Sequence, residues 1–275
     1  MRRLVMYDWK NGVLRAWLRY LLSGILMVLL CMAQMRQARE GVKAGLYSGP
    51  SFGNYLAVWL KGMREPQGIA KIRHLKLPAE WLALQLGHAF VLAGYARADL
   101  DRNGRSLVLR AAGRTAWWDA KCIWAAMGTA VYYLMFYGIV AAASYLSGVI
   151  GAGGSMSVIP ASRIWVSDFA CPGHLVAVLS VFVFLPLTGL CAGLFQVLAE
   201  IAGSPLTALA GICGYQFAVL YWNRPFLLGN YAMLCRLEGL AGSETQLVSG
   251  GICLCLILAG GAYAAGRLVA KRMEF

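Results

Sequence analysis

The sequence predicts an all-α polytopic membrane protein with six transmembrane helices and an N-terminal amphipathic helix at the membrane interface. The first observation is composition: 60% of the 275 residues are hydrophobic and only 13% are charged, whereas soluble domains are roughly 25% charged. The second is a mean hydropathy of +0.62, which places the chain in the membrane class. The third is the alternation of long apolar runs with short basic clusters.

Six apolar runs are candidates for crossing the membrane, because a helix needs about 20 apolar residues to span the hydrocarbon. Backbone polar groups cannot stay unpaired in lipid, so each run should be helical. The second run is short and carries Glu80 at its edge, and Pro186 should kink the fourth. The prediction is one transmembrane domain over 1–275, with spans at 20–35, 79–96, 122–146, 174–199, 205–222 and 247–266.

The basic clusters predict how the chain is oriented. Segments 1–20, 97–121 and 267–275 carry five, six and three Lys/Arg against one, three and one acidic residues. The positive-inside rule places such segments, and therefore both termini, in the cytoplasm. The loop 36–78 would lie outside although it has eight Lys/Arg against two acids; long loops translocate largely regardless of charge. Within it, 53–62 is apolar enough to form a short helix in the outer interface.

The N-terminal segment interleaves basic residues with Leu and Trp. Leu14, Trp17, Leu18 and Leu21 have the spacing of one helix face, and Trp beside basic residues suits the headgroup layer. Two alternatives remain open, a simple flanking anchor and a cleaved signal peptide, although no small-residue cleavage site follows closely. Trp and Lys at span ends are typical of the interface, and the residues expected to anchor there are Trp9, Trp17, Trp117, Trp118 and Lys121.

Small residues spaced four apart predict close helix packing in two spans. Gly189 and Gly193 form a GxxxG pattern in the fourth run, and Gly260 and Ala264 form a small-xxx-small pattern in the sixth. Such pairs let two backbones approach closely in a membrane. The contact could form within the chain or across a dimer.

The eight cysteines do not predict a metal site. They include no CxxC pair, so zinc binding is disfavoured, and most lie in apolar runs, where Cys acts as a small hydrophobe. Cys171 and Cys235 fall in predicted outer loops. A disulfide between them and two unpaired thiols are both open, and the unpaired state is favoured.

Sequence motifs for catalysis are absent. There is no GxxxxGK[ST] phosphate loop, no HExxH and no GxSxG, so no catalytic residue and no cofactor of this chain is predicted. His88 lies inside the second span and Glu200 ends the fourth; both could be functional, but packing and interfacial placement are favoured. The net charge of +13 lies in short clusters between apolar runs, which favours membrane flanks over nucleic-acid binding.

The segment 97–124 concentrates charge between two spans, with six Lys/Arg, three Asp and three Trp. Arg110, Arg114 and Lys121 would meet lipid phosphates. The stretch "ADLDRNGR" at 98–105 is left exposed with mixed charge around a leucine. That mixture suits contact with a protein better than contact with lipid, and a solvated loop is the alternative.

Four stretches together resemble the membrane subunit of a type-two ABC exporter, of the small six-span kind found in Gram-positive bacteria. They are spread over most of the chain, and their combination is more specific than any one alone. They are "FGNYLAVWLKGM" at 52–63, "PAEWL" at 78–82, "DLDRNGRSLVLRAAGRTAWWDAKCIW" at 99–124 and "LLGNYAMLCR" at 227–236.

This resemblance implies a permease in the bacterial cell membrane without an ATPase of its own. Two copies of a separate ABC ATPase subunit would hold ATP and Mg²⁺, and a second permease, identical or related, would complete the transporter. A cytoplasmic coupling helix near 98–105 would dock on the ATPase, and 223–246 would form short re-entrant helices. The contact residues implied are Asp99, Leu100, Asp101, Arg102, Asn103 and Arg105.

Two other functions remain open. An integral membrane enzyme would need groups such as His88 and Glu200 at one depth. A sensor or immunity subunit would bind an antimicrobial peptide without moving it, although the basic loop 36–78 would repel a cationic peptide. The sequence does not distinguish peptide, lipid and drug as cargo.

Overall fold

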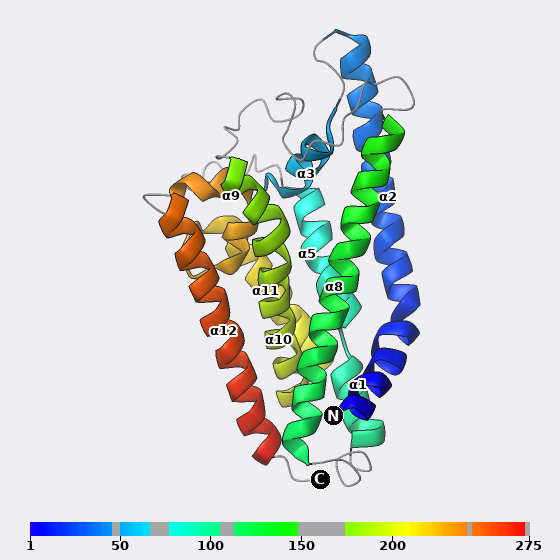
Figure 1. The fold of residues 1–275 in the computed structure, drawn as a ribbon, viewed down its shortest axis with the longest axis vertical. Coiled ribbons are helices and arrows are strands. Elements are labelled where there is room, and N and C mark those ends of the chain that lie inside the picture. The colour runs from blue at the N-terminus through cyan, green and yellow to red at the C-terminus, as the bar shows by residue number, and fades with distance from the viewer. Residues whose placement is uncertain (46–49, 67–76, 105–112, 148–173, 241–243, 273–275) are drawn as a thin grey trace.

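The fold is a bundle of helices that run along one axis. The computed structural model describes residues 1–45, 50–66, 77–104, 113–147, 174–240 and 244–272. No described residue lies in a strand, which confirms the all-α prediction. The helices along the bundle axis are α2 (Trp17–Lys43), α5 (Ala79–Leu92), α8 (Arg114–Ser147), α10 (Leu185–Ala202), α11 (Pro205–Tyr221) and α12 (Glu244–Arg272) (Figure 1).

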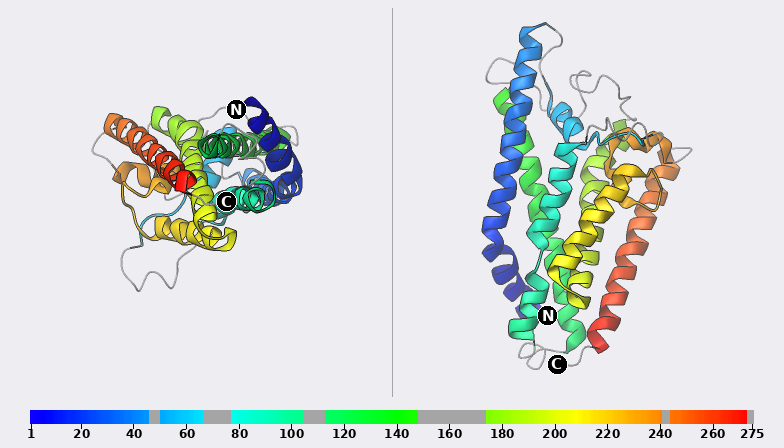
Figure 2. Two further views of the ribbon diagram at one scale, coloured as in Figure 1. Left: turned by 90° about the horizontal axis from the view of Figure 1, so that it is seen from below. Right: turned by 180° about the vertical axis from the view of Figure 1, so that it is seen from behind.

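Both termini lie at the same end of this bundle (Figures 1 and 2). We call the end that holds Arg2 and Arg272 the terminal end and the opposite end the distal end. The short helix α3 (Phe52–Leu60) lies at the distal end, and α6 (Tyr95–Asp99) lies at the terminal end. Placing both termini on one side agrees with an even number of crossings.

Four described segments are long and apolar enough to cross a membrane: Arg2–Lys43, Arg114–Ser147, Val176–Ala202 and Gln246–Arg272. Large apolar side chains stay exposed on the outside of the bundle, such as Leu134 at 70% and Ile257 at 69%. Lipid would cover such a surface, since soluble proteins rarely leave large apolar patches in water. The chain is therefore a multi-pass membrane protein.

The other two predicted spans are shorter than a full crossing. The run 79–96 gives only the 14 residues of α5, and the run 205–222 gives the 17 residues of α11. The chain turns at Gly94, whose φ of 78° is left-handed and favours glycine. That turn ends α5 before the predicted boundary, so six complete spans are not established.

The described part of the predicted loop 97–121, which leaves out 105–112, is largely helical. α6 and the π-helical turn η3 (Leu100–Gly104) fill its first part, and α8 begins at Arg114, eight residues before the predicted third span starts at 122. The sixth run also extends, from 247–266 to Glu244–Arg272. Charged and aromatic residues lower the mean hydropathy of the helix ends, so hydropathy alone does not predict these extra turns.

The N-terminal segment continues into the first span. α1 (Arg2–Asp8), a π-helical turn (Trp9–Val13) and a 3₁₀ turn (Leu14–Ala16) lead directly into α2. The buried face holds Leu4, Asp8 and Val13, whereas Trp17 and Leu18 are exposed. The predicted apolar stripe thus faces outward, and α1 packs on α8 through a different face.

Two irregular regions have clear local causes. The fourth predicted span, 174–199, is built from α9 (His174–Leu179), a π-helical turn (Ser180–Phe184) and α10. Pro186 lies two residues after this turn, and a proline removes one backbone hydrogen bond of the preceding turn. The predicted interfacial helix 53–62 exists as α3, but all nine of its residues are buried, so it packs inside the distal end rather than on its surface.

Candidate functional site

A buried cluster of charges joins three helices at the terminal end. Lys121 of α8 is only 1% exposed, and its Nζ lies 2.5 Å from Asp8 Oδ1 and 2.7 Å from Asp99 Oδ2. Asp8 comes from α1 and Asp99 from α6. Charges this deeply buried are tolerated only when they are paired and hydrogen-bonded, and here one cation faces two carboxylates.

Aromatic side chains complete this cluster. The Tyr95 hydroxyl donates to Asp8 Oδ1 at 2.7 Å, and the Trp117 indole N–H donates to Asp99 Oδ2 at 3.2 Å. The Tyr7 hydroxyl donates to the other oxygen of Asp99 at 3.2 Å. Lys121 Nζ also lies 4.7 Å from the Tyr95 ring centroid, a cation–π distance. Each carboxylate therefore accepts from the cation and from at least one aromatic donor.

The turn before α6 is held from two other helices. Glu200 of α10 accepts the Gly94 N–H with its Oε1 at 2.8 Å. The Arg19 guanidinium of α2 donates to the Ala93 carbonyl oxygen. These bonds satisfy backbone groups that the end of α5 leaves without helical partners. α6 is thus fixed at its start by Glu200 and near its end by Asp99.

The outer face of α6 and η3 is charged and exposed. Arg97 Nε lies 3.1 Å from Asp101 Oδ2, with side chains 36% and 57% exposed, and Arg102 is exposed beside them. Leu100 instead packs against the core. Of the remaining predicted contact residues, Asn103 lies in η3, its side chain outside the description, and Arg105 lies outside the described residues.

Three of the five predicted interface anchors are inside the protein. Trp117, Trp118 and Lys121 are at most 2% exposed, so lipid headgroups cannot reach them. The hydropathy reading placed them at the membrane surface, but α1, α6 and α12 cover them; the Trp118 indole N–H, for example, donates to the Tyr263 carbonyl oxygen at 2.9 Å. Trp17 is 62% exposed, whereas Trp9 is partly buried against the core.

The two predicted packing patterns behave differently. A Cβ at Gly189 would meet Tyr133 Oη at 2.5 Å, and one at Gly193 would meet Leu92 Cδ1 at 2.7 Å. Side chains of α8 and α5 therefore pack directly against the backbone at these two glycines, within the same chain. Gly260 has open space around it and Ala264 is exposed, so this pair makes no close packing contact with the described part of the chain.

His88 and Glu200 do not form one reactive centre. His88 Nε2 shares a hydrogen bond with Thr129 Oγ1 at 2.9 Å, and the ring stacks on Tyr133 with centroids 5.4 Å apart. His88 packs beside Gly193, which lies about 10 Å along α10 from Glu200, at 1.5 Å per residue. Both side chains are engaged in separate packing interactions.

Thiols and metals add no second candidate. Cys235 is a free thiol in this structure, and Cys171 lies outside the described residues, so the predicted alternative pairing is not tested. Among the described residues, no group of three or more His, Cys, Asp and Glu side chains could hold a metal ion.

Sequence reasoning missed Asp8, Tyr95 and Glu200 as members of this site. A signal was present for Asp8, since it is the single acid in the basic segment 1–20. An acid on an otherwise basic amphipathic helix indicates a specific partner. The partner could not be identified, because Lys121 is 113 residues away.

Comparison of the chain with protein-family models, curated proteins and solved structures finds no match.

Proposed function

We propose that this chain is the membrane-spanning permease subunit of an ATP-driven ABC transporter, working as an exporter with a separate ATPase subunit. ATP and Mg²⁺ would bind to two copies of that ATPase, and a second permease copy or a related permease would complete the complex. The terminal end would face the cytoplasm of a bacterial cell, and α6 with η3 would be the coupling element.

One observation carries the proposal: α6 and η3 together are exposed on one side, and on the other side Asp99 of α6 is held by a buried ion pair. The turn η3, which continues α6, exposes Asp101 and Arg102 for polar contacts with a partner, and Arg97 of α6 pairs with Asp101 beside them. The buried face is joined through Asp99 and Lys121 to α8 and α1. A displacement of α6 by a bound partner would therefore also displace α8 and α1. Alternating access by rigid-body motion requires such a concerted displacement of helices.

The roles of the implied contact residues divide accordingly. Asp101 and Arg102 would touch the ATPase, whereas Asp99 would transmit motion within the permease because it is 5% exposed. Leu100 would anchor the turn to the bundle rather than to the partner, since it packs against the core.

The test is a charge reversal that leaves the fold intact. The double variant Asp101→Arg with Arg102→Asp should lose co-purification with the companion ATPase and lose transport, because exposed charges determine partner choice. It should still insert and unfold like the wild type, since exposed substitutions change stability by about 0.5 kcal/mol or less. Arg272→Glu, an exposed change at the end of α12, is the matched control and should keep both properties.

Two results would count against the proposal. Undiminished transport and ATPase capture in the double variant would remove the assigned contact. Failure of the wild type to capture any ATPase from its native membrane would remove the function itself. The membrane-enzyme alternative gains no support from the packing of His88 and Glu200, and the sensor alternative has no specific observation in its favour.

A further inference from the structure

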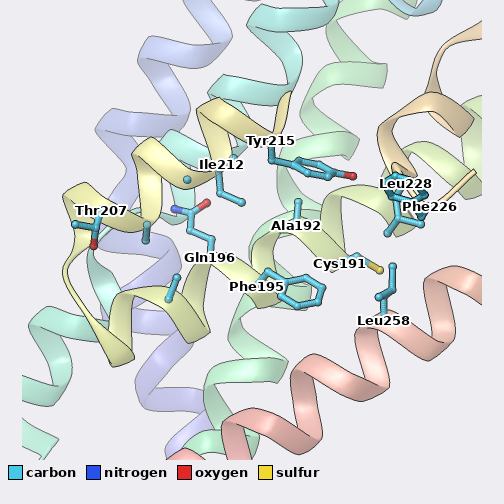
Figure 3. Close-up of a pocket in the computed structure, with 13 residues that line it drawn as sticks. Cys191, Ala192, Phe195, Gln196, Thr207, Ile212, Tyr215, Phe226, Leu228 and Leu258 are labelled. Carbon is cyan, nitrogen blue, oxygen red and sulfur yellow. The ribbon is translucent and has the colours of Figure 1, made fainter. Parts of the chain in front are cut away.

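A groove lies between α10 and α11, apart from the charge cluster. Its cavity volume is about 340 Å³, within the range of small-ligand sites. Phe195 and Gln196 come from α10, Ile212 and Tyr215 from α11, and Leu258 of α12 closes one side (Figure 3). None of the described residues that line it is charged.

The groove is elongated along the helix axes. Cys191, Phe195 and Ala199 line it from α10, and Thr207, Gly211 and Tyr215 line it from α11. Each set is spaced four residues apart, and its first and last members are eight residues apart, which is about 12 Å at 1.5 Å per residue. An elongated space between two helices fits an extended chain better than a compact ring system.

The polar side chains of the groove are already bonded within the protein. Gln196 Nε2 donates to the Ala89 carbonyl oxygen at 2.9 Å and to Glu200 Oε1 at 3.2 Å. Tyr215 Oη accepts the Gly229 N–H at 3.3 Å. Apart from Gln196, Thr207 and Tyr215, the lining is apolar or cysteine, so the chemistry that the groove favours is hydrocarbon.

The groove lies along a membrane-spanning segment. The α10 residues that line it belong to the membrane-spanning segment Val176–Ala202. At its rim, Phe195 is 41% exposed and Phe226 is 65% exposed. Phospholipid is therefore the most abundant molecule with hydrocarbon next to the opening. We propose that this groove binds one acyl chain of a bilayer phospholipid, which enters from the side. This inference does not depend on an ATPase partner.

Gly211 offers a position from which a side chain can be placed in the groove. A Cβ there meets nothing within 4 Å, and the same is true at Gly214, which lies on the same helix but does not line the groove. Phenylalanine at either position should add equally to helix propensity. Gly211→Phe and Gly214→Phe are therefore a matched pair that differs in whether the new ring occupies the groove.

The experiment uses the full-length protein in phospholipid nanodiscs that contain a phospholipid with a photoreactive diazirine on one acyl chain. After illumination, labelled peptides are mapped by mass spectrometry. In the wild type we expect labelling of α10 and α11 at groove residues. Gly211→Phe should reduce that labelling about tenfold or more, the factor that corresponds to about 1.4 kcal/mol, and Gly214→Phe should leave it unchanged.

Every outcome decides the question. Equal labelling in the two variants would mean random bilayer contact, and absent labelling of groove residues would mean that no chain enters; either overturns the proposal. Stronger labelling by a photoreactive free fatty acid than by the phospholipid probe would also overturn it, because the occupant would then be a different lipid. If Gly211→Phe fails to fold, as judged by thermal unfolding, Gly211→Leu is used with the same expected direction.

Discussion

Two buried cations, one near each end of the bundle, are held in opposite ways. Lys121 at the terminal end is neutralised by Asp8 and Asp99, carboxylates that come from two other helices. Arg236 at the distal end, in the 3₁₀ segment η7 (Leu234–Gly239), is 2% exposed. It forms no ion pair with a carboxylate of the described residues, and Glu65 acts on it only at longer range. A buried cation is therefore stabilised by carboxylates at the terminal end and mainly by backbone carbonyl oxygens at the distal end.

The partners of Arg236 are mainly carbonyl oxygens at the end of α11. Its NH2 donates to the Leu220 carbonyl at 2.5 Å, and its NH1 donates to the Val219 carbonyl and to Asn230 Oδ1 at 2.6 Å. Its Nε donates to the Met63 carbonyl at 2.7 Å. A helix C-terminus carries partial negative charge and unpaired carbonyls, so Arg236 caps α11. Burial lowers the pKa of the Arg236 guanidinium from its usual value.

The two cations differ in which parts of the chain they connect. Apart from the Met63 carbonyl, 173 residues away, the partners of Arg236 lie within 17 residues of it, whereas Lys121 pairs with acids of two other helices, one of them 113 residues away. The distal cation therefore mainly holds the chain that follows α11 against the end of that helix. The terminal cation links separate helices, which suits a place where a partner acts on the bundle.

The largest effect that separates the two ends is expected from Lys121→Met. It leaves Asp8 and Asp99 buried without a cation, so the free energy of unfolding should fall by about 3–5 kcal/mol. Thermal unfolding in detergent measures this. The triple variant Lys121→Met, Asp8→Asn, Asp99→Asn should recover most of the loss, because the buried charges are removed together. A single variant as stable as the wild type would show that the ion pairs do not hold the terminal end.

A smaller loss is expected from Arg236→Met. It leaves neutral carbonyls rather than charges without partners, so unfolding should become easier by about 1–3 kcal/mol. Arg236→Lys should restore little of this, because one ammonium cannot reach the Met63 and Leu220 carbonyls in the fork geometry of a guanidinium. The same unfolding assay measures both variants. Full recovery with lysine would mean that charge alone matters, and the contrast between the two ends would disappear.

The smallest effect concerns Cys235, which adjoins Arg236. Burial raises the pKa of its thiol to about 11 from 9.0, even though Arg236 acts to lower it. The thiolate is the reactive form, so alkylation at pH 8 should be about a hundredfold slower in the folded protein than in denaturant, following the two-unit difference in pKa. The sign follows from the raised pKa: the reaction should accelerate as pH rises toward 11.

That measurement uses a variant in which the other cysteines are serine, and mass spectrometry follows iodoacetamide addition. Equal rates in folded and unfolded protein at pH 8 would show that the distal end is open to water around Cys235. The folded state holds this proton more tightly than the unfolded state, so any stability it contributes is present below pH 9 and lost between pH 9 and 11.

The long helices could be predicted because an apolar run of that length can cross a membrane only as a helix or a closed barrel strand, and runs of about 20 residues fit a helix. The uncharged run after His174 and the runs that became α2 and α12 are helical as expected. Boundaries were harder, since residues 114–121 and 244–246 are helical without being apolar. The break after α5 was also not predicted, because the left-handed turn at Gly94 does not change the hydropathy pattern.

By itself, the sequence determined that this chain is a helical multi-pass membrane protein, because hydrophobic runs of that length cannot remain in water. Only the tertiary structure decided which polar residues are buried and paired inside the bundle. Trp117 and Lys121 at the start of a span are typical of a lipid interface, yet α1 and α6 bury them beside Asp8 and Asp99. Pairing across such distances depends on how the helices pack, and a local pattern of residues does not contain that information.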